Sequence, residues 1–238
     1  MSELSEYLDL IKKEKNMKLL PKNIISGVSI LGVPGNSDFT IKVDASVSNQ
    51  NGIQNYITEA NNIDLTTITI TTLASLFASC PNLKKASFKS ANNITNMSSM
   101  FKGCKVLEEI NLSNVDTSNV TNMNSMFYMC QKLTAIPQFD TSNVTNMYRR
   151  FYACVLLEDL TLLNTSKVTN WGEAFYYCEA LTDESLNNIL QMCINATSYT
   201  GTKTLAYLGF NSSWCSASKI QGLSNYQAFL NAGWTIGY

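Results

Sequence analysis

Apolar and polar residues recur in a fixed order between about residues 70 and 190. The clearest markers are a phenylalanine followed three positions later by a cysteine, and these pairs return at a nearly constant interval. The pairs are Phe77 and Cys80, Phe101 and Cys104, Phe127 and Cys130, Phe151 and Cys154, and Phe175 and Cys178. A period this regular predicts a repeat protein in which each cassette forms one structural unit.

Each repeat divides into two halves with different periods. In the first half Val120, Met123, Met126, Phe127 and Cys130 follow a helical spacing, which predicts a short helix. The second half carries an L-x-x-L-x-L pattern, which predicts a short strand. This pattern occurs as Leu83-x-x-Ala86-x-Phe88, Leu107-x-x-Ile110-x-Leu112 and Leu157-x-x-Leu160-x-Leu162. We therefore expect each coil to consist of helix, turn, strand and turn.

Stacking is the expected arrangement of these units, because neither half can bury its apolar face alone. Strands of neighbouring coils then pair in parallel, which predicts an α/β fold. The phenylalanines and cysteines are expected in the core, since a bulky ring and a small thiol recurring in register suit one buried column. Buried free thiols are the favoured state of these cysteines, and disulfides along the column are the alternative.

Two strings of the repeat resemble a known class. They are Asn93-Ile-Thr-Asn-Met-Ser-Ser-Met-Phe-Lys-Gly-Cys104 and Asp116-Thr-Ser-Asn-Val-Thr-Asn-Met123, and they resemble the BspA-like leucine-rich repeat of bacterial surface, phage and prophage proteins. The resemblance covers about half of the chain. It implies a right-handed leucine-rich-repeat solenoid of short parallel strands and short helices. The class is linked with adhesion and recognition and has no shared catalytic motif.

The N-terminal residues 1–45 are predicted to form a small helix and β segment that attaches the chain or makes it oligomerise. Residues 3–15 place four apolar side chains on one helical face, and β-prone runs follow. These runs are similar to an N-I-x-x-G-V-x-I-L-G-V-x-G segment near attachment regions of phage tail and fibre proteins. The alternative is that residues 16–45 cap the repeats. The candidate attachment residues are Leu4, Tyr7, Leu8, Ile11, Ile24, Val28, Ile30 and Val33.

The rest of the chain is predicted to contain the repeats with an N-terminal cap over residues 46–194 and a C-terminal cap over residues 195–238. Trp214 and Trp234 are expected to close the open end of the core. Arg149 and Arg150 replace the Ser-Met of other repeats. The two arginines either make a contact that is specific to this protein or are a substitution on its surface.

Composition mainly excludes classes of function. The formal net charge is −1 without a strong charge run, which disfavours nucleic acid as a partner. No apolar run is long enough to span a membrane, and the acidic N-terminus predicts no classical signal peptide. The chain has no histidine, the commonest general base and transition-metal ligand. We therefore predict no enzyme activity, catalytic residue, cofactor or metal ligand.

Polar residues at the solvent-facing strand positions form the candidate binding face. They are Lys85, Ser87, Glu109, Asn111, Asp159 and Thr161. We expect this face to contact a receptor, a glycan or a neighbouring subunit. The chain is predicted to be a non-enzymatic component of a phage or phage-tail-like virion. We also expect the chain to form homo-oligomers through its N-terminus. The alternative is a bacterial cell-surface BspA-like adhesin, which predicts an export signal. The hypothesis of an enzyme built on the repeats predicts a cluster of titrating groups, and the lack of histidine argues against this hypothesis.

Overall fold

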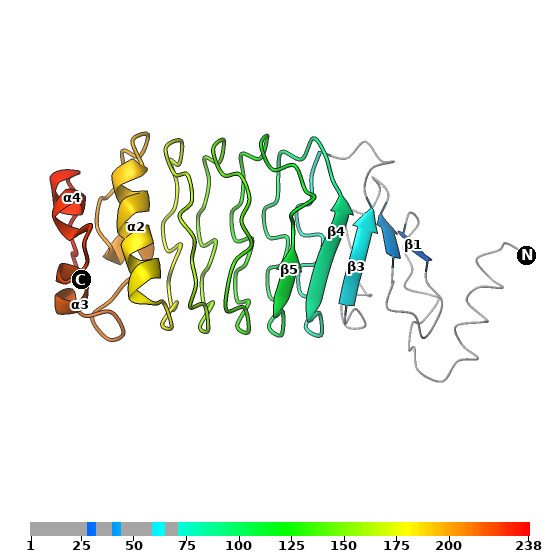
Figure 1. Ribbon diagram of the computed structural model, residues 1–238, viewed down its shortest axis with the longest axis horizontal. Coiled ribbons are helices and arrows are strands. Elements are labelled where there is room, and N and C mark those ends of the chain that lie inside the picture. The colour runs from blue at the N-terminus through cyan, green and yellow to red at the C-terminus, as the bar shows by residue number, and fades with distance from the viewer. Residues whose placement is uncertain (1–27, 32–39, 44–58, 65–70) are drawn as a thin grey trace, which may run out of the picture.

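The computed structural model describes residues 28–31, 40–43, 59–64 and 71–238. Figure 1 shows successive coils along the long axis, with the C-terminal helices at one end. The mixed α/β composition agrees with the prediction. The strands are β1 (Val28–Leu31), β2 (Thr40–Val43), β3 (Glu59–Asp64), β4 (Lys85–Ser90) and β5 (Glu109–Asn111). The helices are α2 (Asp183–Asn195), the 3-10 helix η2 (Ala206–Leu208), α3 (Ala217–Gln221) and α4 (Tyr226–Asn231).

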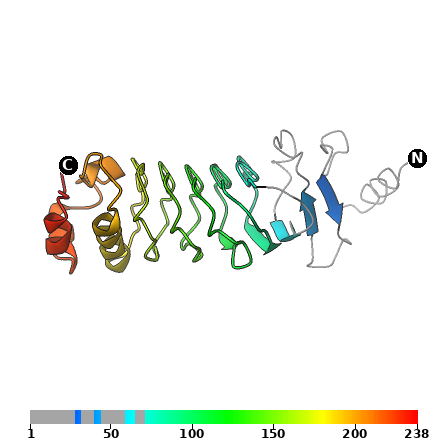
Figure 2. The same cartoon turned by 90° about the horizontal axis from the view of Figure 1, so that it is seen from above.

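Two small sheets contain these strands. β1 and β2 pair antiparallel, and β3, β4 and β5 form a parallel sheet in that order. Figure 2 places the parallel strands along one side of the stack and the remainder of each coil on the opposite side. Later coils continue the parallel arrangement through isolated bridges, such as the one between Ala135 and Asp159.

The predicted core column is confirmed. Each of the five repeat phenylalanines and cysteines is at most 2% exposed. The rings of Phe77, Phe101, Phe127, Phe151 and Phe175 stack with centroids 5.6 to 5.8 Å apart. All seven cysteines are buried free thiols, as favoured from the sequence. The thiol of Cys154 donates to the carbonyl of Phe127 in the preceding coil at 3.0 Å. Cys104, Cys130 and Cys178 each donate in the same way to the repeat phenylalanine of the preceding coil.

The prediction of a short helix in the first half of each repeat is wrong. We call this half the turn half of the coil, because it consists of consecutive tight turns. In one coil the N–H of Met126 donates to the carbonyl of Met123, and the N–H of Tyr128 donates to the carbonyl of Ser125. Ser125 and Met129 adopt positive φ angles of 53° and 60°, which a right-handed helix excludes. Every second N–H donates instead to the next coil, so the backbone groups that a helix would satisfy internally hold neighbouring coils together.

These cross-coil hydrogen bonds recur throughout the stack. In one coil the N–H groups of Met123, Ser125, Phe127 and Met129 donate to carbonyls of the following coil at 2.7 to 2.9 Å. The same four positions of the preceding coil, beginning at Met97, also donate at 2.7 to 2.9 Å. Apolar residues three and four apart therefore face the core here without forming a helix.

The strand predicted over Leu157–Leu162 is also wrong, because this coil contributes only the bridge at Asp159. Leu162, expected at a core position, is 50% exposed, whereas Leu163 is 3% exposed. The chain thus shifts by one residue after Leu160. This shift places Leu163 rather than Leu162 against the core.

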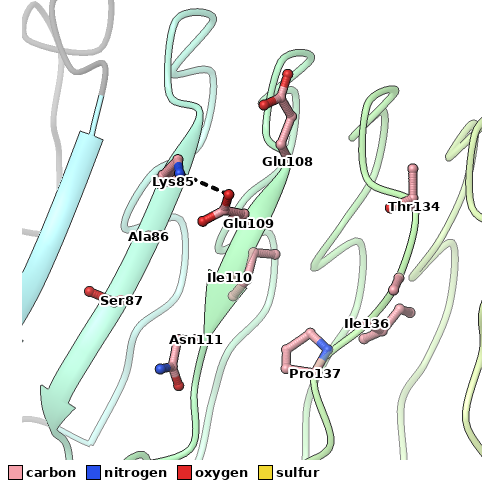
Figure 3. A pocket seen from close by; sticks show the side chains of 11 residues that line it. Lys85, Ala86, Ser87, Glu108, Glu109, Ile110, Asn111, Thr134, Ile136 and Pro137 are labelled. Atoms are coloured by element: carbon pink, nitrogen blue, oxygen red, sulfur yellow. Dashed lines mark ion pairs between the residues drawn. The ribbon is translucent and has the colours of Figure 1, made fainter.

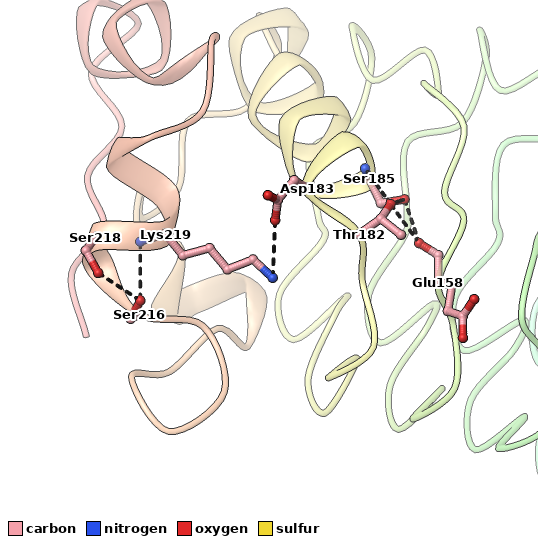
Figure 4. Close-up of polar contacts among 7 residues, drawn as sticks. All are labelled: Glu158, Thr182, Asp183, Ser185, Ser216, Ser218 and Lys219. Carbon is pink, nitrogen blue, oxygen red and sulfur yellow. Dashed lines mark hydrogen bonds and ion pairs between the residues drawn. The ribbon is translucent and has the colours of Figure 1, made fainter.

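Helix α2 covers the end of the strand side where another coil would otherwise stack. Ser185 on α2 accepts from the N–H of Leu160 at 2.8 Å and donates to the carbonyl of Glu158 at 2.7 Å. Thr182 caps the helix by accepting from the N–H of Ser185, and Lys219 on α3 pairs with Asp183 at 3.4 Å (Figure 4). Side chains of α2 therefore satisfy backbone groups that an open sheet edge would expose.

The C-terminal unit is closed by aromatic packing, as expected for Trp214 and Trp234. Trp234 is 1% exposed, stacks on Tyr199 at 5.5 Å and meets Trp171 edge-on at 5.6 Å. Trp214 lies beside Phe210, with ring centroids 4.9 Å apart. Helix α2 begins inside the range predicted for the repeats, 46–194, and ends at Asn195. The predicted domain boundaries remain predictions.

Candidate functional site

Four of the six predicted binding-face residues lie together on β4 and β5. The parallel register places Lys85 beside Glu109 and Ser87 beside Asn111. The Lys85 ammonium and the Glu109 carboxylate are 2.8 Å apart, and their side chains are 42% and 66% exposed. An ion pair this exposed contributes little to stability, about 0.2–1 kcal/mol. Both charges therefore remain accessible to a ligand.

A hollow of about 650 Å³ opens next to these four residues. Figure 3 shows Ile110 of β5 on one side and Pro137 of the following coil on the other, with Lys85 and Glu109 at one end. We call this site the strand hollow. Its lining is Lys85, Ala86, Ser87, Glu108, Glu109, Ile110, Asn111, Thr134, Ala135, Ile136 and Pro137.

The strand hollow lies where the parallel ladder of backbone hydrogen bonds is interrupted. The N–H groups of Glu108 and Glu109 donate back to Lys84, and those of Glu158 and Asp159 donate back to Thr134. Within the described residues, no backbone hydrogen bond joins β5 to residues 134–137. Two sequence features accompany the break: Pro137 has no N–H to donate, and the repeat step from Phe101 to Phe127 is longer than each of the other steps.

The chemistry of the strand hollow suits binding. It combines an ammonium group, two carboxylates, an amide and hydroxyls with the apolar surfaces of Ile110, Ile136 and Pro137. Ligand sites commonly combine apolar walls with a few polar groups that fix orientation. Among the residues described here, no cluster of three or more metal-binding side chains occurs. No helix in that same part of the chain is long and apolar enough to cross a membrane.

The other two predicted face residues lie outside the lining of the strand hollow. Asp159 is exposed and bridges to Ala135 on the preceding coil. Thr161 is half-buried, and its hydroxyl has no hydrogen-bond partner in the part of the chain that the structure describes. The structure therefore does not bring these two residues into one site with Lys85 and Glu109.

The candidate attachment residues fall mainly outside the described part of the chain. Val28 and Ile30 lie on β1, in register with Val43 and Ile41 of β2. The other six lie outside the described residues: Leu4, Tyr7, Leu8, Ile11, Ile24 and Val33. Attachment through this segment remains a prediction.

The two adjacent arginines have different environments. Arg149 is on the surface and pairs with Glu173 at 3.0 Å. Arg150 is fully buried, which excludes a surface substitution at that position. Burial lowers the pKa of Arg150 to about 9, and its Nε and Nη2 atoms lack hydrogen-bond partners among the described residues. The guanidinium lies 4.7 Å from the ring of Phe139 and 4.9 Å from that of Phe151, which are favourable but weak contacts.

Comparison with known proteins gives the family. Residues 71–189, half of the chain, match the family described as Mycoplasma protein of unknown function, DUF285. The chain belongs to the DUF285 family. This membership supports the resemblance to BspA-like repeats drawn from the sequence, and the matched span covers all five Phe–Cys pairs.

Other comparisons add little to the DUF285 assignment. No curated protein matches the chain. Among solved structures, it is similar to the "Crystal structure of T. pallidum Leucine Rich Repeat protein (TpLRR)", with 17% sequence identity and a TM-score of 0.42. That similarity covers 69% of this chain and 69% of the other.

Proposed function

We propose that this DUF285 chain is a non-enzymatic interaction module, built as a right-handed leucine-rich-repeat solenoid, that binds its partner through the strand hollow. The observation that carries the proposal is the grouping of Lys85, Ser87, Glu109 and Asn111 beside a break in the ladder. Polar side chains and apolar walls meet there on a rigid stack of coils. A rigid scaffold lowers the entropy lost on binding.

The lining of the strand hollow favours recognition over catalysis. Among the lining residues, Glu108 and Glu109 are the only carboxylates, and Lys85 already neutralises one of them. Ser87 and Thr134 supply hydroxyls without a histidine, because the chain contains none. The commonest activated serine and cysteine nucleophiles rely on a neighbouring histidine base. Hydrogen bonding and charge pairing are the roles that these groups support.

We further propose that the module works in a phage or phage-tail-like particle, where it contacts a host receptor, a glycan or a neighbouring subunit. The N-terminal resemblance to phage attachment segments supports this setting. A small recognition face would then gain strength from many copies acting together. The alternative setting is the bacterial cell surface, where the chain would act as a BspA-like adhesin. Sedimentation of particles from the source bacterium, followed by immunodetection of the chain, tests the two settings. The chain should be found in the particle fraction if it is a virion component, and in the envelope fraction if it is an adhesin.

Substitution of Asn111 by arginine tests the binding site. Asn111 is exposed, so the long side chain should extend into the strand hollow without disturbing the core. We expect the fluorescently labelled wild-type full chain to bind at least one probe of a glycan array or a bacterial envelope fraction. Asn111→Arg should weaken that binding at least tenfold, about 1.4 kcal/mol.

The matched control is Gln227→Arg on α4, which adds the same side chain at an exposed position remote from the lining residues. It should bind as the wild type does. Equal binding by Asn111→Arg and wild type, or a loss of the same size in Gln227→Arg, would rule out the strand hollow as the binding site.

A further inference from the structure

The turn half of the last three repeats carries an outward column of tyrosines. Tyr128, Tyr152 and Tyr176 each follow an interior phenylalanine, and their rings stack at 4.8 and 5.0 Å. The first two repeats have Ala78 and Lys102 at the same position. Because those coils adopt the same turns without a tyrosine, coil formation does not require the rings.

A charged pair lies beside this column. Arg149 donates from Nε and Nη2 to the two carboxylate oxygens of Glu173, at 3.0 and 3.3 Å. The guanidinium also lies over the rings of Tyr148 and Tyr152, at 4.9 and 5.5 Å. Repeats one to three place Ser75, Ser99 and Ser125 at the position that Arg149 and Glu173 occupy. The last two repeats therefore differ from the others outside the core.

Together these residues form a surface that we call the Tyr–Arg face. The Arg149 and Glu173 side chains are 38% and 37% exposed, and Tyr177 is 42% exposed. Tyrosine and arginine are among the residues most enriched where binding energy concentrates in protein interfaces. Mutual stacking already orders these rings, so little side-chain entropy is left to lose on association. The members are Tyr128, Tyr148, Arg149, Tyr152, Glu173, Tyr176 and Tyr177.

The geometry of the Tyr–Arg face favours a protein partner over a sugar. Tyr152 lies between Tyr128 and Tyr176, so both of its ring faces are covered. Tyr128 has Tyr152 on one side and the Lys102 ammonium 5.4 Å from its ring centre. Tyr128, Tyr152 and Tyr176 are each only partly buried, which leaves part of each side chain for packing and hydrogen bonding with a protein.

We propose that the Tyr–Arg face binds the same face of a second copy of this chain, related by a two-fold axis. The face carries a cation and an anion in neighbouring coils, which makes it complementary to itself under that symmetry. Arg149 of each copy then lies opposite Glu173 of the second copy, and the tyrosine edges pack between them. A partner of a single charge sign would instead meet one like-charged group. Strands β4 and β5, which line the strand hollow, lie on the side of the stack opposite the turn halves (Figure 2), so the strand hollows remain open in the dimer.

Charge reversal tests this dimer on the full chain. Light scattering should give a dimer for the wild type, whereas Arg149→Glu and Glu173→Arg should each be monomeric, because each meets a second copy of like charge. A mass that neither variant lowers would instead indicate assembly through residues 1–45. An equimolar mixture of the two variants should restore the dimer, as opposite charges then face each other at both pairs. Both positions are partly exposed, so both variants should retain the circular dichroism spectrum of the wild type.

Two further variants keep the test decisive. Tyr152→Ser should weaken dimerisation at least tenfold, and Leu162→Ser, which changes a 50% exposed residue outside the Tyr–Arg face, should leave it unchanged. A wild type that stays monomeric up to about 100 µM would overturn the proposal. A dimer unaffected by either charge reversal, or a mixture that stays monomeric, would overturn it as well. None of these outcomes depends on the ligand of the strand hollow.

Discussion

Replacement of Arg150 by methionine should raise the free energy of unfolding by about 1–4 kcal/mol. The guanidinium is fully buried, and its one hydrogen bond in the described structure goes to the sulfur of Met147, at 3.7 Å. Leaving Nε and Nη2 unpaired in the core carries a desolvation penalty that the contacts with Phe139 and Phe151 only partly offset. The second and third repeats place Met100 and Met126 at this position, so methionine fits the column.

Urea unfolding followed by circular dichroism measures this effect. Lys132→Met is the control, because it removes an exposed cation outside the Tyr–Arg face and should change stability by less than about 0.5 kcal/mol. A loss of stability in Arg150→Met would contradict the account. It would mean that the buried guanidinium has a compensating partner that stabilises the fold.

Substitution of Phe127 by alanine should lower the free energy of unfolding by about 3–5 kcal/mol. Phe127 lies in the middle of the core column, is fully buried and stacks at 5.8 Å on both Phe101 and Phe151. Its removal leaves a cavity with coils on both sides, which the cross-coil hydrogen bonds prevent from collapsing.

The same urea titration checks this substitution. Lys132→Ala, an exposed position of the next turn, is the control and should alter stability by less than about 0.5 kcal/mol. A Phe127→Ala variant as stable as the control would show that the ring is not part of a buried column, and the register of every repeat would be wrong.

The sequence predicts the core of this protein well because burial follows directly from residue type and spacing. A phenylalanine and a cysteine that recur at a nearly constant interval can be buried only if the coils stack in register, and Phe127 and Cys130 occupy that column. The sequence also favours free thiols, with disulfides as the alternative, and the structure has free thiols. Their burial raises the pKa of Cys154 to about 12, which keeps the thiol protonated.

The turn halves could not be predicted from the apolar pattern, because two backbone conformations give nearly the same spacing. Tight turns with left-handed residues at Ser125 and Met129 bring Met123, Met126, Phe127 and Cys130 to the core just as a helix would. The difference lies in where the N–H groups donate, which depends on residues of the following coil. A pattern within one repeat contains no information on that distant partner.

The candidate site was predicted in part. Strand alternation correctly groups Lys85 with Glu109 and Ser87 with Asn111. The strand hollow itself depends on the missing ladder at residues 134–137, and only Pro137 and the longer repeat step before Phe127 hinted at it. Arg150 was missed as a buried residue because arginine is rarely found in a core without a partner.

The central claim is that cross-coil hydrogen bonds hold the stack together and that these bonds are missing at the strand hollow. Amide hydrogen exchange of the full chain, read by mass spectrometry, tests it most directly. Peptides over residues 97–103 and 123–129 should exchange slowly, because every second N–H donates to the next coil, whereas residues 134–139 should exchange at least tenfold faster. Equally slow exchange over residues 134–139 would show a continuous ladder and contradict the account of the site.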